Sequence, residues 1–175
     1  MKIINIDDKY YPEKLKLINN PPNTIYVEGN IDILNNKAIT VVGSRNMSEY
    51  GKNITNQIVK DLVKYNLNIV SGLALGIDSV AHNSCLENKG KTIAVIAGGF
   101  NHIFPPENIQ LHNRIINSGG CIISEHAPDV IPKKAFFPMR NRIVSGLTDA
   151  TLVIEATYRS GTSITAKYAK LQGKD

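Results

Sequence analysis

Five short clusters of small and hydroxyl residues follow apolar runs in this sequence, and two of the clusters carry an arginine. They are Gly43-Ser44-Arg45, Ser71-Gly72, Gly98-Gly99, Ser124-Glu125-His126 and Arg159-Ser160-Gly161-Thr162. Glycine lets a ligand come close to backbone N–H groups, and serine and threonine hydroxyls add further hydrogen-bond donors. One such cluster is usually only a turn. Their recurrence together with two arginines predicts a phosphate-binding rim.

A second stretch, residues 130–148, carries four basic side chains and no acidic one. Its basic residues are Lys133, Lys134, Arg140 and Arg142, and they are interleaved with Phe136 and Phe137. Cations for phosphates and aromatic faces for bases are what single-stranded nucleic acid binding requires. The plainer alternative is that the lysines form a solvated face and the phenylalanines anchor the start of a helix in the core.

Signals for catalysis and for metal binding are weak. Asp78 and His82 lie four residues apart on a predicted helix, and we expect them to form a structural pair rather than a catalytic one. The histidines show no metal-ligand spacing, and Cys85 and Cys121 stand alone as ordinary buried thiols. Neither GxGxxG nor GxxxxGK[ST] occurs, so the usual nucleotide-binding fingerprints are missing. We therefore predict no catalytic residue, no metal and no cofactor.

The elements that must position these residues alternate from residue 38 onward. Apolar runs rich in Val, Ile and Thr predict strands at residues 38–43, 67–71, 92–98, 121–124 and 150–155. Amphipathic patterns predict helices at residues 48–65, 76–88, 107–117, 138–146 and 162–171. This alternation predicts an α/β fold: a Rossmann-like, three-layer, doubly wound and mostly parallel sheet. In such a sheet, ligands bind at the carboxyl ends of the strands, where all five clusters fall.

Length and composition agree with one globular domain. The chain has 175 residues with 42% hydrophobic content, and a net charge of +5 that is compatible with a nucleic-acid partner. No apolar run approaches the ~20 residues of a membrane span, and the early acidic residues do not fit a secretion signal. Scarce cysteine favours a reducing cytoplasm. We read residues 1–37 as a lead-in segment and residues 38–175 as the Rossmann-like domain, which we expect to be truncated before a final strand.

The order of these motifs resembles the DNA-processing protein A (DprA, also called Smf) family. The resemblance rests on Gly43-Ser44-Arg45, Ser71-Gly72-Leu73-Ala74, Gly76-Ile77-Asp78, Phe104-Pro105 with Asn108, Phe137-Pro138 with Arg140-Asn141-Arg142, and Ser160-Gly161-Thr162. It covers nearly the whole chain. One departure is Pro106, which stands where family members often carry a lysine.

The resemblance implies a protein that binds and protects incoming single-stranded DNA and loads the recombinase RecA on it during natural transformation. It implies no enzymatic activity, a homodimer, no membrane association and commonly a C-terminal winged helix. Carried over to this sequence, the DNA-contacting residues would be Gly43, Ser44, Arg45, Ser71, Gly72, Phe137, Arg140, Asn141, Arg142, Ser160, Gly161 and Thr162. Phe137 or a neighbour would stack on a base.

The alternative is a nucleotide sensor or an enzyme similar to the phosphoribohydrolases that cleave nucleoside monophosphates. Those enzymes are marked by an Arg-Lys pair and by a catalytic glutamate that follows a Pro-Gly-Gly-x-Gly-Thr loop. Here Arg140-Asn141-Arg142 stands at the position of the pair, and no glutamate follows Thr162. A site that must stabilise a departing base has lost its acid, so the sequence disfavours hydrolysis.

Overall fold

The computed structural model describes residues 1–157 and 160–175, and within them seven strands form one sheet. The strands are β1 (Lys2–Asn5), β2 (Thr24–Gly29), β3 (Ala38–Val42), β4 (Asn68–Ser71), β5 (Thr92–Val95), β6 (Cys121–Ser124) and β7 (Ala150–Val153). Their spatial order is β1-β2-β6-β5-β4-β3-β7. Strands β3 to β7 pair in parallel, and β1 and β2 are antiparallel additions at one side. The predicted mostly parallel α/β sheet is confirmed.

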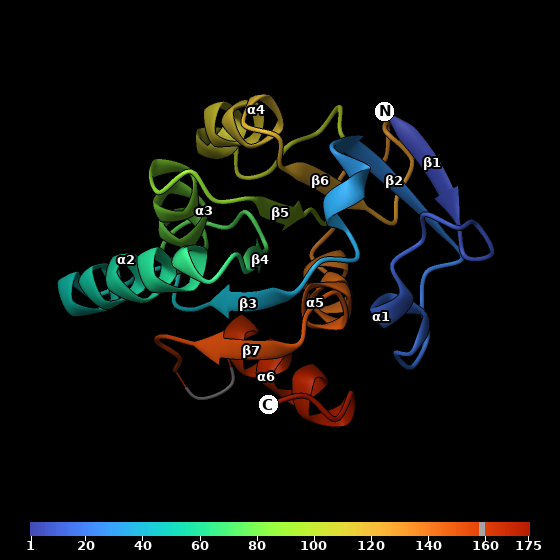
Figure 1. The fold of residues 1–175 in the computed structure, drawn as a ribbon. Helices are drawn as coiled ribbons and strands as arrows, with labels where there is room; N and C mark the ends of the chain where they lie inside the picture. Colours follow the sequence, from blue (N-terminus) through green and yellow to red (C-terminus); the bar gives the residue numbers. More distant parts are fainter. Residues whose placement is uncertain (158–159) are drawn as a thin grey trace.

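Helices cover both faces of this sheet (Figure 1). They are α1 (Glu13–Lys16), α2 (Glu49–Lys64), α3 (Ile77–Glu87), α4 (Ile109–Asn117), α5 (Phe136–Gly146) and α6 (Gly161–Leu171), with short 3-10 turns η1 (Ile31–Ile33) and η2 (Pro106–Asn108). Helices α2, α3 and α4 form one layer, and α1, α5 and α6 form the other (Figure 1). This gives the three layers that the sequence predicts.

The central strands β4, β5 and β6 are buried along their whole length because both faces of the sheet are covered there. On the α2–α3 face, Val59 of α2 and Ala81 of α3 pack with Ile69 of β4. On the opposite face, Ile143 of α5 packs with Val70 of β4 and with Leu15 of α1. The sheet is therefore the rigid centre from which the connecting loops project.

The lead-in segment of residues 1–37 belongs to the same sheet and the same core as the rest of the chain. Strand β2 pairs with β6, with Tyr26 opposite Ser124, and β1 then pairs with β2. Tyr11 and Leu15 are fully buried in one cluster with Ile143. The boundary expected at residue 37 therefore does not divide two cores.

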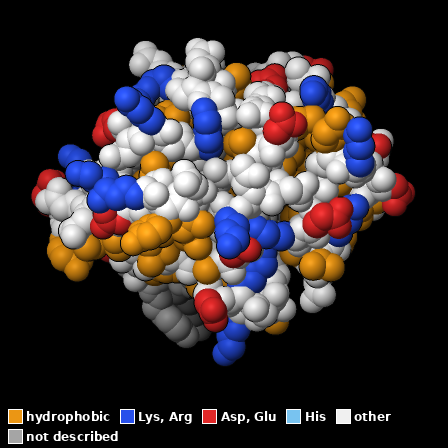
Figure 2. All heavy atoms as spheres, in the orientation of Figure 1, with side chains coloured by type: hydrophobic (Ala, Val, Ile, Leu, Met, Phe, Trp, Pro, Cys, Tyr) orange, Lys and Arg blue, Asp and Glu red, His pale blue; other side chains and the backbone are white. Residues whose placement is uncertain are grey.

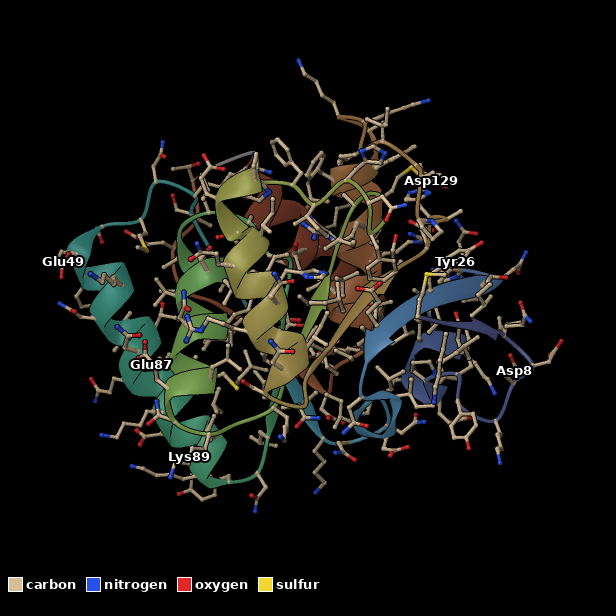
Figure 3. The ribbon with its side chains drawn as sticks, turned by 90° about the horizontal axis from the view of Figure 1, so that it is seen from above. Asp8, Tyr26, Glu49, Glu87, Lys89 and Asp129 are labelled. Carbon is tan, nitrogen blue, oxygen red and sulfur yellow. The ribbon has the colours of Figure 1, made fainter. Side chains whose placement is uncertain are left out.

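The loops at the two ends of the parallel strands lie along opposite edges of the sheet. In the view from above, Asp129 in the loop after β6 lies at the upper edge, and Lys89, just before β5, lies at the lower edge (Figure 3). The upper edge holds the carboxyl ends of the parallel strands and the beginnings of the helices that follow them. Among the helices that the structure describes, none is both long and apolar enough to span a membrane.

Candidate nucleic-acid interface

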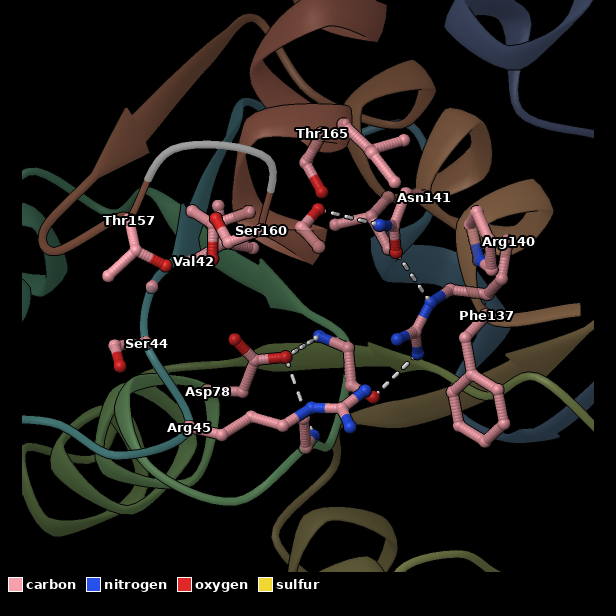
Figure 4. Close-up of a pocket in the computed structure, with 18 of the residues that line it drawn as sticks. Val42, Ser44, Arg45, Asp78, Phe137, Arg140, Asn141, Thr157, Ser160 and Thr165 are labelled. Carbon is pink, nitrogen blue, oxygen red and sulfur yellow. Dashed lines mark hydrogen bonds between the residues drawn. The ribbon is translucent and has the colours of Figure 1, made fainter. Parts of the chain in front are cut away.

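A pocket of about 390 Å³ opens at the carboxyl ends of β3, β4 and β7 (Figure 4). Its walls are the loops after these three strands and the first turns of α5 and α6. This volume lies within the range of ~300–1,000 Å³ that is usual for ligand sites. The topology thus brings segments up to 123 residues apart, from Val42 to Thr165, into one concave site.

Arg45 supplies the exposed positive charge of the pocket. Its guanidinium carbon lies 5.8 Å from the ring centre of Phe137, and no ion pair occupies it among the residues described. The loop that carries it is held by the Ser44 hydroxyl, which accepts a hydrogen bond of 3.1 Å from the backbone N–H of Asn46. Arg45 is therefore free to pair with an anion from solution.

A glycine allows the neighbouring loop to approach Arg45. Gly76 has a φ of 78°, in the left-handed region, and a Cβ at this position would collide with the carbonyl oxygens of Ser44 and Arg45. Only glycine satisfies both demands without strain. The loops after β3 and β4 are consequently packed backbone against backbone at the rim of the pocket.

Arg140 forms the floor of the pocket, and its side chain is only 6% exposed. Its Nη1 donates a hydrogen bond of 2.6 Å to the carbonyl of Gly72 and another to the carbonyl of Val95. Its Nε donates to Oδ1 of Asn141 at 3.2 Å. Burial lowers the pKa of Arg140 to about 10 despite the nearby carboxylate of Asp78, so the group remains charged at neutral pH. Arg140 positions the loop after β4 and adds a positive field from below.

Asp78 fastens the same loop from the other side. Its Oδ2 accepts hydrogen bonds from the backbone N–H groups of Gly72 at 3.1 Å and Ala74 at 3.4 Å (Figure 4). Burial raises the pKa of this carboxyl, and the positive charge of Arg140 opposes that rise. Asp78 therefore shapes the pocket through the backbone.

The expected pairing of Asp78 with His82 is wrong. Nδ1 of His82 lies 2.7 Å from the hydroxyl of Thr92 on β5, and its ring is fully buried. The Asp78 carboxylate turns instead toward the loop at the start of α3. The two side chains separate because the carboxylate accepts from the backbone N–H groups of Gly72 and Ala74, in the loop before α3, and leaves the neutral ring one turn away.

Helix beginnings add positive character around the pocket. Residues in the first turns of α3, α5 and α6 line it, namely Asp78, Phe137 and Thr162. Ser160 caps α6, its hydroxyl accepting from the backbone N–H of Ser163 at 3.3 Å, and Asn141 Nδ2 donates to the carbonyl of Gly161 at 3.1 Å. The N-termini of helices favour bound anions because their first N–H groups point outward unpaired.

The structure brings most of the predicted site residues together. Those that line the pocket are Gly43, Ser44, Arg45, Gly72, Phe137, Arg140, Asn141, Ser160, Gly161 and Thr162. Asn46, Thr157 and Thr165 also line it, although the sequence analysis did not include them in the site. Arg159, which the sequence analysis placed at the same edge, lies outside the described residues.

Ser71 and Arg142 do not line the pocket, and each has a structural partner instead. The Ser71 hydroxyl is fully buried and donates to the carbonyl of Val41 at 2.7 Å, which ties β4 to β3. Arg142 makes a two-pronged ion pair with Glu125, at 2.9 and 2.6 Å, and donates to the carbonyl of Asn20 at 3.0 Å. Two helical residues turn the chain by about 200°, so Arg142 points away from the side that Arg140 occupies.

Charge elsewhere on the molecule is mixed. On the face drawn in Figure 2, lysine and arginine side chains are scattered among acidic and apolar ones and do not gather in one patch.

The pocket itself carries a net positive charge. Its described charged residues are Arg45, Arg140 and Asp78, which leave an excess of one positive charge there. The described residues contain no cluster of His, Cys, Asp or Glu able to hold a metal ion. A ligand of this pocket would be anionic.

The sheet order and the positively charged pocket at the strand ends define a Rossmann-like α/β protein. The chain belongs to the DNA recombination-mediator protein A family, whose family model matches residues 2–175. It is 43% identical over 173 residues to DNA processing protein DprA of Bacillus subtilis, an alignment that covers 98% of this chain and 58% of that protein. The chain therefore spans a little over half the length of this relative.

Two solved structures have the same fold. DprA from Streptococcus pneumoniae matches with a TM-score of 0.93 at 39% identity, over 99% of this chain and 61% of that one. DprA from Helicobacter pylori matches with a TM-score of 0.88 at 28% identity, over 99% of this chain and 78% of that one. The latter was described for its mode of binding single-stranded DNA.

Proposed function

We propose that this chain binds single-stranded DNA in the pocket at the strand ends and acts as a recombination mediator without chemistry on the strand. The observation that carries the proposal is the placement of Arg45 and Phe137 side by side, 5.8 Å apart, at a pocket bordered by three helix beginnings. A free guanidinium and an aromatic ring are the two components that sequence-independent binding of a single strand uses. The family of the chain supports the same role.

The proposal assigns the contacts by exposure. Arg45 and the backbone N–H groups of Gly161 and Thr162 would hold phosphates, because these residues line the pocket. Arg140 and Asn141 would support these groups from below, since their hydrogen bonds go to protein carbonyls and to each other. Ser71 and Arg142 would make no contact with DNA.

The absence of chemistry is also a proposal. Asp78, the acidic side chain among the described lining residues, is buried and holds two backbone N–H groups. An enzyme of the phosphoribohydrolase type would require an acid free to reach its substrate. We therefore expect no hydrolysis of nucleoside monophosphates. Free mononucleotides should also bind far more weakly than an oligonucleotide, because each phosphate contact contributes little alone.

The wider role extends beyond the pocket. As the family resemblance implies, we propose that the protein protects incoming DNA, delivers it to RecA during natural transformation and does so as a homodimer. We place this activity in the cytoplasm, where the buried thiols of Cys85 and Cys121 would stay reduced.

The core of the proposal is tested by comparing the affinity for a single strand with the affinity for the matching duplex. The strand has roughly 30 nucleotides, about twice the upper site size of a single binding fold. The measurement is made at two salt concentrations. We expect clear preference for the single strand and a fall in affinity with salt, because counterions are released from neutralised phosphates. Equal affinity for the duplex would reduce the pocket to a generic charge site. Mononucleotide affinity equal to that of the oligomer would favour the sensor or enzyme instead.

A further inference from the structure

One phenylalanine beside the pocket leaves half of its surface exposed. Phe104 is 50% exposed, whereas Phe100, four residues earlier in the same connection, is 8% exposed and packs in the core. A phenylalanine ring has no polar atom that water could satisfy, and truncating a half-exposed ring leaves little cavity in the core. A large part of the ring is therefore available to a ligand.

The backbone around Phe104 is held on both sides. Ile103 packs against the core cluster, and Pro105 is buried. Three residues further on, Asn108 Nδ2 donates to the carbonyl of Leu73 at 2.8 Å and to the hydroxyl of Ser79 at 2.9 Å. The segment that carries the exposed ring is thus tied to the loop after β4, which forms part of the pocket. A segment that is already ordered loses less conformational freedom when a ligand stacks on its side chain.

Phe104 continues the row of groups that begins at Arg45. The ring centres of Phe104 and Phe137 are 5.6 Å apart, with their planes at 72°. The Arg45 guanidinium lies 5.8 Å from the Phe137 ring. Phe137 is half-buried between these two neighbours, so Phe104 has the larger free ring surface. Cation, supporting ring and exposed ring follow one another outward from the pocket.

We propose that Phe104 is a base-stacking residue, and that one nucleobase of a single strand rests on its ring while Arg45 holds a phosphate of the same strand. This inference rests on the proposed function and adds a residue to it. Every base has a π-face, so the contact is independent of sequence. A duplex keeps its bases inside the helix and cannot offer one to the ring, which makes Phe104 a source of selectivity for single strands.

The test separates the base from the phosphates. An oligothymidylate of roughly 16 nucleotides, the upper end of common site sizes, is compared with an abasic oligomer that has the same backbone and charge. We expect Phe104→Ala to weaken binding of oligothymidylate at least about fivefold, the lower end of the effect of losing one base–aromatic stack. Binding of the abasic oligomer should stay unchanged. Arg45→Ala should weaken both.

Three further variants complete the experiment. Phe104→Tyr keeps a ring and should retain affinity, and Phe104→Leu keeps apolar bulk without a ring and should lose it. Tyr65→Ala removes another exposed aromatic, 78% exposed and located after α2 at the opposite edge of the sheet, and should change nothing. The thermal midpoint of each variant confirms that it is folded.

Each outcome has one meaning. If Phe104→Ala binds oligothymidylate as the wild type does, or loses affinity equally for both oligomers, the stacking assignment is wrong while the proposed function stands. If the wild type binds neither oligomer, the proposed function fails and the stacking assignment fails with it.

Discussion

Nη2 of Arg140 and Oδ2 of Asp78 meet around the Cα of Gly72, on the floor of the pocket. A Cβ on Gly72 would lie 2.6 Å from the first atom and 2.7 Å from the second. Both side chains are buried and already bound to the loop, Arg140 through the carbonyl of Gly72 and Asp78 through its N–H. A glycine is thus required here because two opposite charges occupy the space that a side chain would fill.

Gly72→Ala should therefore destabilise the protein and weaken its binding of single-stranded DNA. We expect a loss of about 1–3 kcal/mol in the free energy of unfolding, the usual cost of overpacking. Urea titration measures it. Gly161→Ala is the stability control, because a Cβ at Gly161 meets nothing within 4 Å. Equal stability of the wild type and Gly72→Ala would show that Arg140 and Asp78 can move apart freely.

Breaking the ion pair between Arg142 and Glu125 should affect stability alone. We expect a large loss of stability and no change in DNA binding. Both side chains are about nine-tenths buried, at 8% and 12% exposure. Glu125→Ala leaves a buried guanidinium unpaired, so we expect a loss of about 3–5 kcal/mol in the free energy of unfolding. Where the variant is folded, the salt dependence of DNA binding should match that of the wild type.

An exposed pair serves as the control for Glu125→Ala. Asp61 lies 2.7 Å from Lys64 on α2, and both side chains are more than half exposed. Asp61→Ala should leave stability nearly unchanged because solvent screens such pairs. A changed salt slope in folded Glu125→Ala would return Arg142 to the list of DNA contacts.

Much of the fold could be predicted because its signals are local. The parallel strands in the middle of the sheet are buried on both faces, so unbroken runs such as Thr92–Val95 and Cys121–Ser124 mark them in sequence. The site followed from topology, since clusters that come after parallel strands must meet at one edge. Strand β1 was missed because four residues at the edge of a sheet, three of them exposed, carry almost no pattern.

The direction of individual side chains could not be predicted in this way. The spacing of Arg140 and Arg142 says that only one of them faces the pocket, but which one depends on Glu125, a residue from another loop. The hydroxyl of Ser71 turns inward because the carbonyl of Val41 lies beside it in the sheet. The role of Asp78 had a usable signal, an acidic residue in the first turn of a helix. Exposed Phe104 had none, since burial is a property of the folded chain.

His82 should make the protein sensitive to mild acid. Burial, aided by the positive charge of Arg140, lowers the pKa of His82 from 6.5 to about 3. Between these values the unfolded chain binds a proton that the folded chain refuses, so stability falls as the pH falls below 6.5. The slope is about 1.4 kcal/mol per pH unit, which gives a loss of about 2 kcal/mol between pH 7 and pH 5.

Urea unfolding of the wild type and His82→Gln at pH 7 and pH 5 measures this contribution. The variant loses the contact with Thr92 and should be less stable at pH 7, but the difference between its two stabilities should be smaller than in the wild type. The comparison is needed because burial also lowers the pKa of His126, which is present in both proteins. An unchanged pH dependence in His82→Gln would mean that the folded protein accommodates the charged ring.

Arg45 tests the site most directly, because it is exposed in the pocket and supports no core. A phosphate-contacting arginine acts on every sequence alike, and its loss removes the release of counterions from one phosphate. Arg45→Ala should therefore weaken single-strand binding about tenfold or more. It should also make the plot of log affinity against log salt shallower by about 0.7, and the thermal midpoint should hardly move.

Arg114→Ala is the control for Arg45→Ala. It removes the same charge from an exposed position in the last turn of α4, where Nη1 of Arg114 donates to Oδ1 of Asn83 at 2.7 Å. Because this turn lies at the amino ends of the strands, Arg114→Ala should keep both the affinity and the slope. If Arg45→Ala and Arg114→Ala change the affinity and the slope equally, Arg45 acts only through the net charge of the protein, and the loop after β3 is only a turn.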